Sequence, residues 1–149
     1  MRAQKHFEDF AVGETWKSPP RTVTDAHFLF FSALTGDDHP IHGDHVTAAR
    51  HPFGRRVTHG LLLSSMTAMG GSELSSDVAT TVLAFLEQRS RFLKPVFVGD
   101  SVTPVFEVAA CESKSGGRGL VRIKVAVLDE AGEPVLEGEH VYLIKARQA

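Results

Sequence analysis

The chain has 149 residues, a length that suits one domain spanning 1–149 and that can bury a sizeable core, and its 42% hydrophobic and 23% charged residues are typical of a soluble globular protein. A formal net charge of −2 excludes a general attraction to nucleic acid or an anionic membrane, and the one cysteine, Cys111, excludes an internal disulfide. Because the N-terminus lacks the apolar run of a signal peptide and no stretch is apolar enough to cross a bilayer, we expect a cytoplasmic protein.

The N-terminal third is predicted to hold one short strand and two helices. The strand is expected at 14–17. Thr24 is a favourable N-cap for a helix from 25 to about 34, which Gly36 ends, and a second short helix is expected at 44–50. Three apolar side chains recur at helical spacing in the first helix and are expected to face the core, namely Phe28, Phe31 and Leu34.

The stretch 33–45 gathers three carboxylates and three imidazoles around two glycines and one proline. Pro40 lacks an N–H and disfavours helical geometry at the preceding residue, so a loop is expected at 37–42. On such a loop Asp37 and His42 can converge on one water molecule and form a general acid–base pair. Aspartate and histidine are also common in turns and helix caps, so a purely structural loop stays open as an alternative.

The most apolar segment of the chain, 57–71, is predicted to form one long helix that Thr58 caps. Its leucines and methionines leave no wide polar face, so the helix is expected to be buried on most sides. Small residues are interspersed among them and would let strands approach closely, namely Ser64, Ser65, Thr67, Ala68 and Gly70.

The second half of the chain has the periodicity of strands. A β-prone run at 80–86 turns polar at 87–91, and further strands are predicted at 102–110, 120–128 and 135–144. Helices followed by an antiparallel meander indicate an α+β architecture, in which the sheet curls around the apolar helix.

Three motifs in this order resemble those of a known family. Gly36-Asp-Asp-His-Pro-Ile-His42 resembles a Gly-Asp-x-Asn-Pro-(Leu/Ile)-His signature, His59-Gly-Leu-Leu-Leu-Ser-Ser65 resembles a His-Gly entry to a central helix, and Phe92-Leu-Lys-Pro-Val-Phe-Val-Gly-Asp100 resembles a Phe-x-x-Pro-Val-x-x-Gly-Asp strand. All three belong to the MaoC-like dehydratases, which include the (R)-specific enoyl-CoA hydratases. The resemblance covers roughly residues 7 to 145 and is specific at the level of the family.

The resemblance implies a hotdog fold, an antiparallel β-sheet wrapped around a long central α-helix, paired through sheet edges into a homodimer or a larger even assembly. It implies a hydro-lyase of fatty acid metabolism that hydrates a trans-2-enoyl thioester to an (R)-3-hydroxyacyl thioester, or performs the reverse dehydration. The carrier would be coenzyme A or an acyl-carrier protein, with its pantetheine arm in a tunnel at the dimer interface. Coenzyme A is then part of the substrate, and no separate cofactor, nucleic acid or membrane partner is expected.

Carried across motif by motif, the resemblance implies that Asp37 and His42 are the catalytic pair that holds the water. It implies that the backbone N–H near Gly60 binds the thioester oxygen and that Ser65 supports the pair from the helix. His39 stands where the family usually has asparagine, and an imidazole differs from an amide in reach and in its ability to charge. The substrate-binding residues expected from the match are His39, Gly60, Leu61 and Ser65.

Several alternatives accompany this interpretation. A metal site is conceivable for His39, His42 and His45 with Asp37 or Asp38, but the spacing matches no standard zinc pattern and no metal is expected. His59 is expected to cap or pack at the start of the apolar helix, and Cys111 is interpreted as a structural thiol. The competing functions are thioester hydrolysis on the same fold and a non-catalytic thioester-binding subunit.

Overall fold

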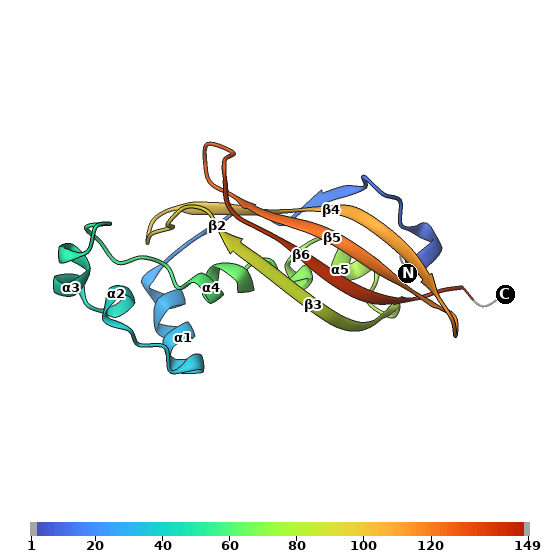
Figure 1. Ribbon diagram of the computed structural model, residues 1–149, viewed down its shortest axis with the longest axis horizontal. Coiled ribbons are helices and arrows are strands. Elements are labelled where there is room, and N and C mark those ends of the chain that lie inside the picture. Colours follow the sequence, from blue (N-terminus) through green and yellow to red (C-terminus); the bar gives the residue numbers. More distant parts are fainter. Residues whose placement is uncertain (1–2, 148–149) are drawn as a thin grey trace.

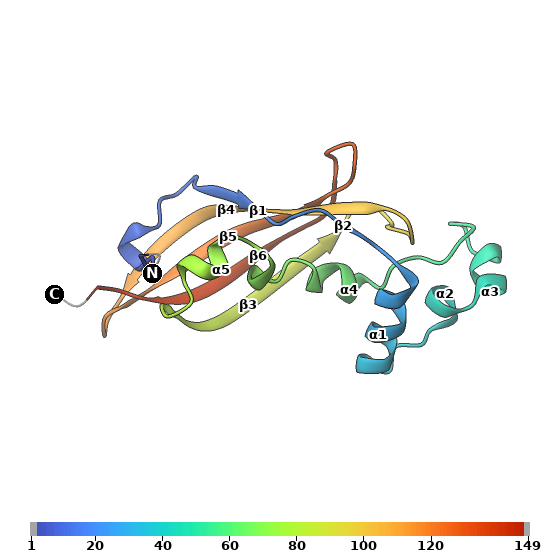
Figure 2. The same cartoon turned by 180° about the vertical axis from the view of Figure 1, so that it is seen from behind.

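The structure is a computed structural model that describes residues 3–147. Figures 1 and 2 show it from two opposite sides. The helical segments are η1 (Phe7–Asp9), α1 (Asp25–Thr35), α2 (Pro40–Gly43), α3 (His45–Arg50), α4 (Gly60–Ser65), η2 (Met69–Gly71) and α5 (Leu74–Asp77). The strands are β1 (Thr15–Lys17), β2 (Arg21–Thr22), β3 (Val82–Phe92), β4 (Ser101–Lys114), β5 (Arg118–Leu128) and β6 (Pro134–Lys145). Helices before long strands confirm the predicted α+β architecture.

The strands form an antiparallel sheet in the order β1–β4–β5–β6–β3, with β2 also paired to β4. Burial alternates along β5 as predicted, because successive side chains of a strand point to opposite faces. The outer face carries cross-strand ion pairs. Lys124 lies 3.6 Å from Glu107 and Arg122 lies 3.3 Å from Glu139, so this face is polar.

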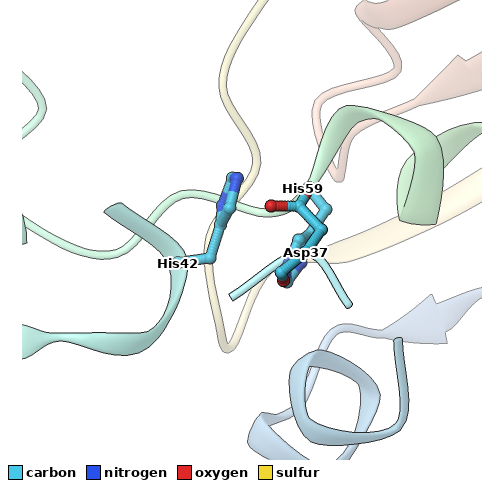
Figure 3. A group of neighbouring side chains, drawn as sticks. All are labelled: Asp37, His42 and His59. Atoms are coloured by element: carbon cyan, nitrogen blue, oxygen red, sulfur yellow. The ribbon is translucent and has the colours of Figure 1, made fainter. Parts of the chain in front are cut away.

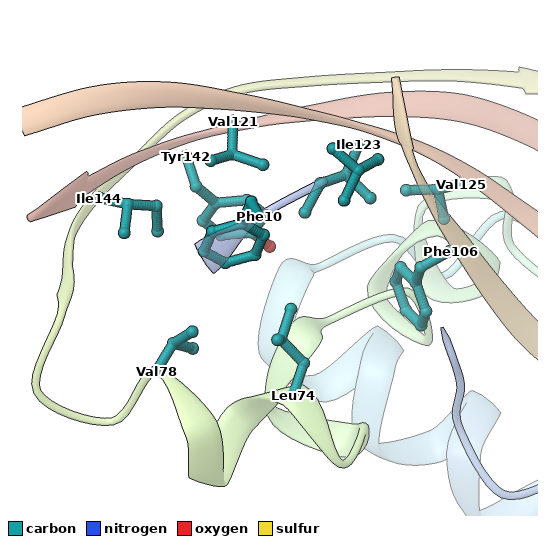
Figure 4. Packing of buried hydrophobic residues seen from close by; sticks show 10 residues of the cluster. Phe10, Leu74, Val78, Phe106, Val121, Ile123, Val125, Tyr142 and Ile144 are labelled. Carbon is teal, nitrogen blue, oxygen red and sulfur yellow. The ribbon is translucent and has the colours of Figure 1, made fainter. Parts of the chain in front are cut away.

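The inner face of the sheet packs against two clusters of buried side chains. One cluster lies between the sheet and α5 and is shown in Figure 4, where Leu74 and Val78 face Val121, Ile123 and Val125 across Phe10. The other cluster joins the helices at the far end to the sheet, and its members are Val23, Phe28, Leu62, Leu63, Val96, Val102, Val127, Val135 and Leu136. The second cluster holds α1 and α4 beside each other through Phe28, Leu62 and Leu63.

The predicted single long helix over 57–71 is wrong, because the segment is broken. Within 57–71 the α-helix is limited to α4, and a turn and the short 3₁₀ helix η2 follow it. The next helix, α5, is a separate short piece beyond this segment. The hydroxyls offer a reason. Ser65 Oγ donates to the Leu62 carbonyl at 2.7 Å and Thr67 Oγ1 donates to the Ser64 carbonyl at 2.6 Å. Such bonds to nearby carbonyls compete with the helical ladder. The cap is also different, since His59 and not Thr58 is the N-cap residue, and it makes no side-chain capping bond.

Two further expectations need correction. The prediction ended the strand at 86 and left the polar run 87–91 outside it, but β3 continues through that run to Phe92. β3 lies at the edge of the sheet and, within residues 3–147, is paired only with β6, so much of its length faces solvent and tolerates polar side chains. Leu34 was expected in the core but is 84% exposed, since α1 buries Phe28 on its other side.

The segment α1–α3 projects beyond one end of the sheet, at the end away from both chain termini (Figures 1 and 2). We call α1, α2 and α3 with their connecting loops the helical arm. The chain returns from the arm to the sheet through residues 51–59 and enters α4. Within 3–147, no helix has the length and apolar character needed to span a membrane.

Candidate active site

The chain turns sharply between α1 and α2. Gly36 ends α1 in the left-handed conformation (φ 75°), and its N–H donates to the Ser32 carbonyl at 2.8 Å. A loop was predicted over 37–42, but Pro40 starts the short helix α2, at the position where its missing N–H costs nothing. The same proline that cannot continue α1 therefore begins the helical turn that carries His42.

His42 is held by the chain that returns from the arm. Its Nδ1 lies 2.7 Å from the carbonyl oxygen of Val57. A carbonyl can only accept a hydrogen bond, so Nδ1 carries the proton and, in the neutral ring, Nε2 carries a free lone pair. This is the tautomer that a general base at Nε2 requires.

Asp37, His42 and His59 each place one carboxylate oxygen or ring nitrogen within 4.8 Å of the other two (Figure 3). A separation of up to this size allows one water molecule to hydrogen-bond to both the carboxylate and an imidazole. The structure thus brings together the predicted pair, Asp37 and His42, and adds His59.

His39 and His45 are not in this cluster. His39 is the exposed N-cap of α2, where its Nδ1 accepts the Ile41 N–H at 3.3 Å, and its ring centroid is 6.2 Å from that of His42. His45 is exposed at the start of α3. The metal alternative built from the three imidazoles of this stretch is therefore not assembled.

The cluster that does assemble is poorly arranged for a metal. The rings of His42 and His59 are stacked, with centroids 3.9 Å apart and planes inclined by 23°. Imidazole lone pairs lie in the ring plane, so in two stacked rings they run side by side and do not converge on one ion. In addition, His59 Nε2 is already 3.1 Å from the backbone carbonyl of Asp37. The arrangement suits proton transfer better than coordination.

His59 was expected only to cap or pack at a helix start, and its packing is confirmed. It is 1% exposed, and its ring contacts those of Phe28 and Phe31 as well as His42. Burial, together with the nearby imidazole of His42, lowers the pKa of His59 below its ordinary value. The His-Gly pair of the second motif was the one sequence signal that pointed to His59. Nothing in the sequence indicated that His59 contacts Asp37 and His42 of the first motif.

The remaining predicted site residues lie on α4. Gly60 is its first residue, with an N–H that the helix cannot pair. A Cβ at this position would lie 3.1 Å from Phe92 Cζ. Leu61 is 67% exposed beside it. Ser65 is exposed, and its hydroxyl bonds the carbonyl of Leu62, so support of the pair by Ser65 stays a prediction.

Gly60 also lies on the wall of a small, mostly apolar cavity of about 290 Å³. Its other lining residues are Phe53, Val57, Thr58, Leu63, Phe92, Leu93, Lys94, Pro95 and Val96. A larger cavity of about 1000 Å³ is lined by strand residues that include Lys17, Glu107 and Lys124 and by none of the site residues. The smaller cavity meets the candidate site at Gly60, whereas Asp37, His42 and His59 are not among its lining residues.

Comparison with known proteins identifies the family. The model for the MaoC like domain matches residues 8–131. The chain belongs to the MaoC-like family. This MaoC-like chain is 31% identical over 145 residues to the 3-hydroxybutyryl-CoA dehydratase of Methylorubrum extorquens, covering 96% of the chain and 86% of that relative. It is 32% identical over 117 residues to the (R)-specific enoyl-CoA hydratase of Aeromonas caviae, covering 78% of the chain and 82% of that relative.

The MaoC-like chain spans only part of one relative, Protein MaoC of Klebsiella aerogenes. The two are 34% identical over 99 residues, which make up 66% of the chain and 29% of that protein.

Solved structures agree on the fold. A monoamine oxidase regulatory protein from Archaeoglobus fulgius has a TM-score of 0.93 and 32% identity, covering 99% of the chain and 98% of that structure. A Mycobacterium tuberculosis protein with a double hotdog fold has a TM-score of 0.79 at 21% identity, covering 97% of the chain and 45% of that structure. The MaoC-like chain therefore has the predicted hotdog fold, with the central helical segment broken.

Proposed function

We propose that this protein is an (R)-specific hydro-lyase that adds water to a trans-2-enoyl thioester, or removes it from an (R)-3-hydroxyacyl thioester. The observation that carries the proposal is the convergence of the Asp37 carboxylate and the His42 imidazole on one point. The names of two relatives, a 3-hydroxybutyryl-CoA dehydratase and an (R)-specific enoyl-CoA hydratase, support the same reaction.

The paired groups would act on one water molecule. His42 Nε2 has a free lone pair because Nδ1 is bonded to Val57, so Nε2 can take a proton from the water as its oxygen attacks the β-carbon. Asp37 accepts the second hydrogen of that water and fixes its orientation. A proton returns from the pair to the α-carbon on the same face, so the elements of one water add across the double bond.

Negative charge develops on the thioester oxygen during this addition. The N–H of Gly60 is the proposed donor to that oxygen, because it begins α4 and lacks a helical partner. α4 has six residues, so we ascribe the effect to the directed N–H and assign little to a helix dipole. Leu61 and His39 are both exposed and are proposed to contact the substrate.

The cavity beside Gly60 is proposed to receive apolar substrate groups. Its walls include Phe53, Leu63 and Phe92, which suit an acyl chain or the pantetheine arm. Coenzyme A is the proposed carrier, since the names of both relatives include it. An acyl-carrier protein is the other possible carrier and is tested by offering the same acyl group on each.

A homodimer is proposed because one edge of the sheet is open and apolar. Among the described strands β3 pairs only with β6, and several of its side chains are about half exposed, namely Leu83, Phe85, Leu86 and Phe92. Unpaired backbone groups beside apolar side chains favour pairing with another strand, and a second copy offers the same edge.

The proposed reaction is tested with crotonyl-CoA. We expect loss of enoyl absorbance without release of free thiol, and chiral analysis of the product should give the (R)-3-hydroxy isomer. Release of thiol without loss of enoyl absorbance would show a thioesterase and overturn the proposal. If neither signal changes with crotonyl-CoA, with longer enoyl-CoA substrates or with enoyl groups on acyl-carrier protein, the chain is not a hydro-lyase.

A further inference from the structure

The proposed proton transfer by Asp37 and His42 does not use His59, although His59 is the most deeply buried residue of the site. It is 1% exposed and lies where the chain enters α4 from the helical arm. His59 contacts both members of the proposed catalytic pair. Nε2 lies 3.1 Å from the backbone carbonyl oxygen of Asp37, and the ring stacks on His42.

The hydrogen bonds determine where the proton of His59 lies. The Asp37 carbonyl oxygen can only accept, so His59 Nε2 must donate to it. Ser32 Oγ donates to the same oxygen at 2.8 Å and lies 3.2 Å from Nε2. Nδ1, in contrast, is buried without a hydrogen-bond partner. A proton on Nδ1 would be a buried, unsatisfied donor, which is costly, so the ring is neutral with its proton on Nε2.

The surroundings of His59 favour the neutral ring on balance. From α1 it is enclosed by Phe28, at 5.3 Å between centroids, and by Phe31, at 4.9 Å, both uncharged. The ionisable groups that face it are His42 from α2 and Asp37 from the preceding loop. Burial is the largest cause of its lowered pKa, and the charge of His42 acts in the same direction, whereas the hydrogen bond to the Asp37 carbonyl and the charge of Asp37 act in the opposite direction and are outweighed.

We propose that His59 is a positioning residue that sets the geometry of the acid–base pair by holding both members at once. Its Nε2–H fixes the backbone of Asp37, and its ring face fixes the imidazole plane of His42. Because the ring stays neutral, it can lie against His42 without opposing the proton that His42 receives. This role rests on the proposed hydro-lyase function and goes beyond the pair itself.

Two substitutions separate the two contacts. His59→Phe keeps an aromatic ring against His42 and removes the donor to Asp37, whereas His59→Gln keeps an N–H near the position of Nε2 and removes the ring. Misplacement of reacting groups by about 1 Å can cost about 100-fold in rate. We therefore expect each variant to lower kcat for crotonyl-CoA by roughly 10- to 100-fold, with KM changed less than about threefold.

His45→Phe and His45→Gln are the matched controls, since His45 is an exposed histidine of the helical arm and lies outside the site. Both should keep kcat within about twofold of the wild type, as expected for surface substitutions away from the site. A folded His59 variant of either kind with wild-type kcat, or a loss confined to KM, would overturn the proposal. If the wild type itself does not hydrate enoyl thioesters, the proposed hydro-lyase function fails. That outcome is distinct from an active wild type whose His59 variants are equally active, which overturns only the role of His59.

A measurement on the wild type covers the case in which the variants do not fold. Imidazole ¹⁵N NMR, assigned by the signal missing in a His59 variant or by selective labelling, should report a proton on Nε2 and a bare Nδ1. Because burial lowers the pKa of His59, that pattern should persist to a lower pH than in an ordinary histidine. A proton on Nδ1 of the neutral ring, or protonation at the pH of an ordinary histidine, would contradict the role of His59.

Discussion

The ring of His42 stacks on the ring of His59, with centroids 3.9 Å apart. His42 belongs to the helical arm, whereas His59 is the N-cap residue of α4, which packs on the sheet. This contact therefore joins the arm to the body of the fold at the point where Asp37 lies. The geometry of the proposed site depends on that junction as much as on the loop that carries Asp37.

Removal of either member of the pair should abolish most activity. General acid–base groups typically contribute about 100- to 10,000-fold, so Asp37→Asn and His42→Ala should each lower kcat for crotonyl-CoA by that range. Asp37 is exposed, and its replacement should leave the melting temperature nearly unchanged. Asp38→Asn, at the exposed neighbouring position, is the control and should remain active. Losses below about tenfold in both variants would indicate a purely structural loop.

Gly60 should not tolerate a side chain. A Cβ would lie 3.1 Å from Phe92 Cζ, so Gly60→Ala must displace either the ring or the N–H that is proposed to bind the thioester oxygen. Loss of such a donor costs about 100- to 1000-fold in other enzymes, and a displaced donor should cost part of that. Adding Phe92→Leu should restore activity, which a double-mutant cycle measures. Equal activity of Gly60→Ala and the wild type would exclude a close fit here.

The buried residue His140 should make the protein less stable in mild acid. Thr67 Oγ1 donates to the Ser64 carbonyl and so accepts from His140 Nε2, while Tyr142 lies 3.3 Å from Nδ1. Burial lowers the pKa of His140 to about 4 from an ordinary value of 6.5. Between these values only the unfolded chain takes up the proton, so stability is full above pH 6.5 and falls as the pH drops toward 4.

This effect is measured by urea unfolding at a fixed protein concentration. Between about pH 7.5 and pH 5 the free energy of unfolding should fall by about 2 kcal/mol on account of His140. His140→Gln should flatten the dependence, though not fully, since burial also lowers the pKa of His59. A wild-type curve as flat as that of His140→Gln would contradict the assignment.

The open edge of β3 should hold the proposed dimer together. The double variant Leu83→Lys with Leu86→Lys places charges on two half-exposed positions of that edge. It should sediment as a monomer, whereas the wild type should sediment as a dimer or larger even assembly. Val12→Lys, at a 67% exposed position outside the edge, is the control and should behave as the wild type. A monomeric wild type would remove the basis for the dimer.

Local sequence signals were sufficient for much of the fold. Thr24 and Gly36 delimited α1 because caps and left-handed glycines act within one or two turns of the chain. The alternation along 120–128 predicted β5 because a strand with one buried face must alternate. The same is true of Asp37 and His42: Asp37 lies just before the turn that Pro40 starts and His42 lies within it, so their proximity follows from a few residues.

Tertiary structure decided the rest. The sequence by itself indicated the strands, the first helix, the acid–base pair and the resemblance to the family. Only the assembled fold showed that Leu34 faces outward, that the polar half of β3 lies on an exposed edge, and that the central helix is broken where Ser65 and Thr67 bond nearby carbonyls. It also showed that His59 holds both Asp37 and His42. These features depend on which segments, distant in the sequence, pack against each other. Capping signals and local periodicity carry no information about such packing.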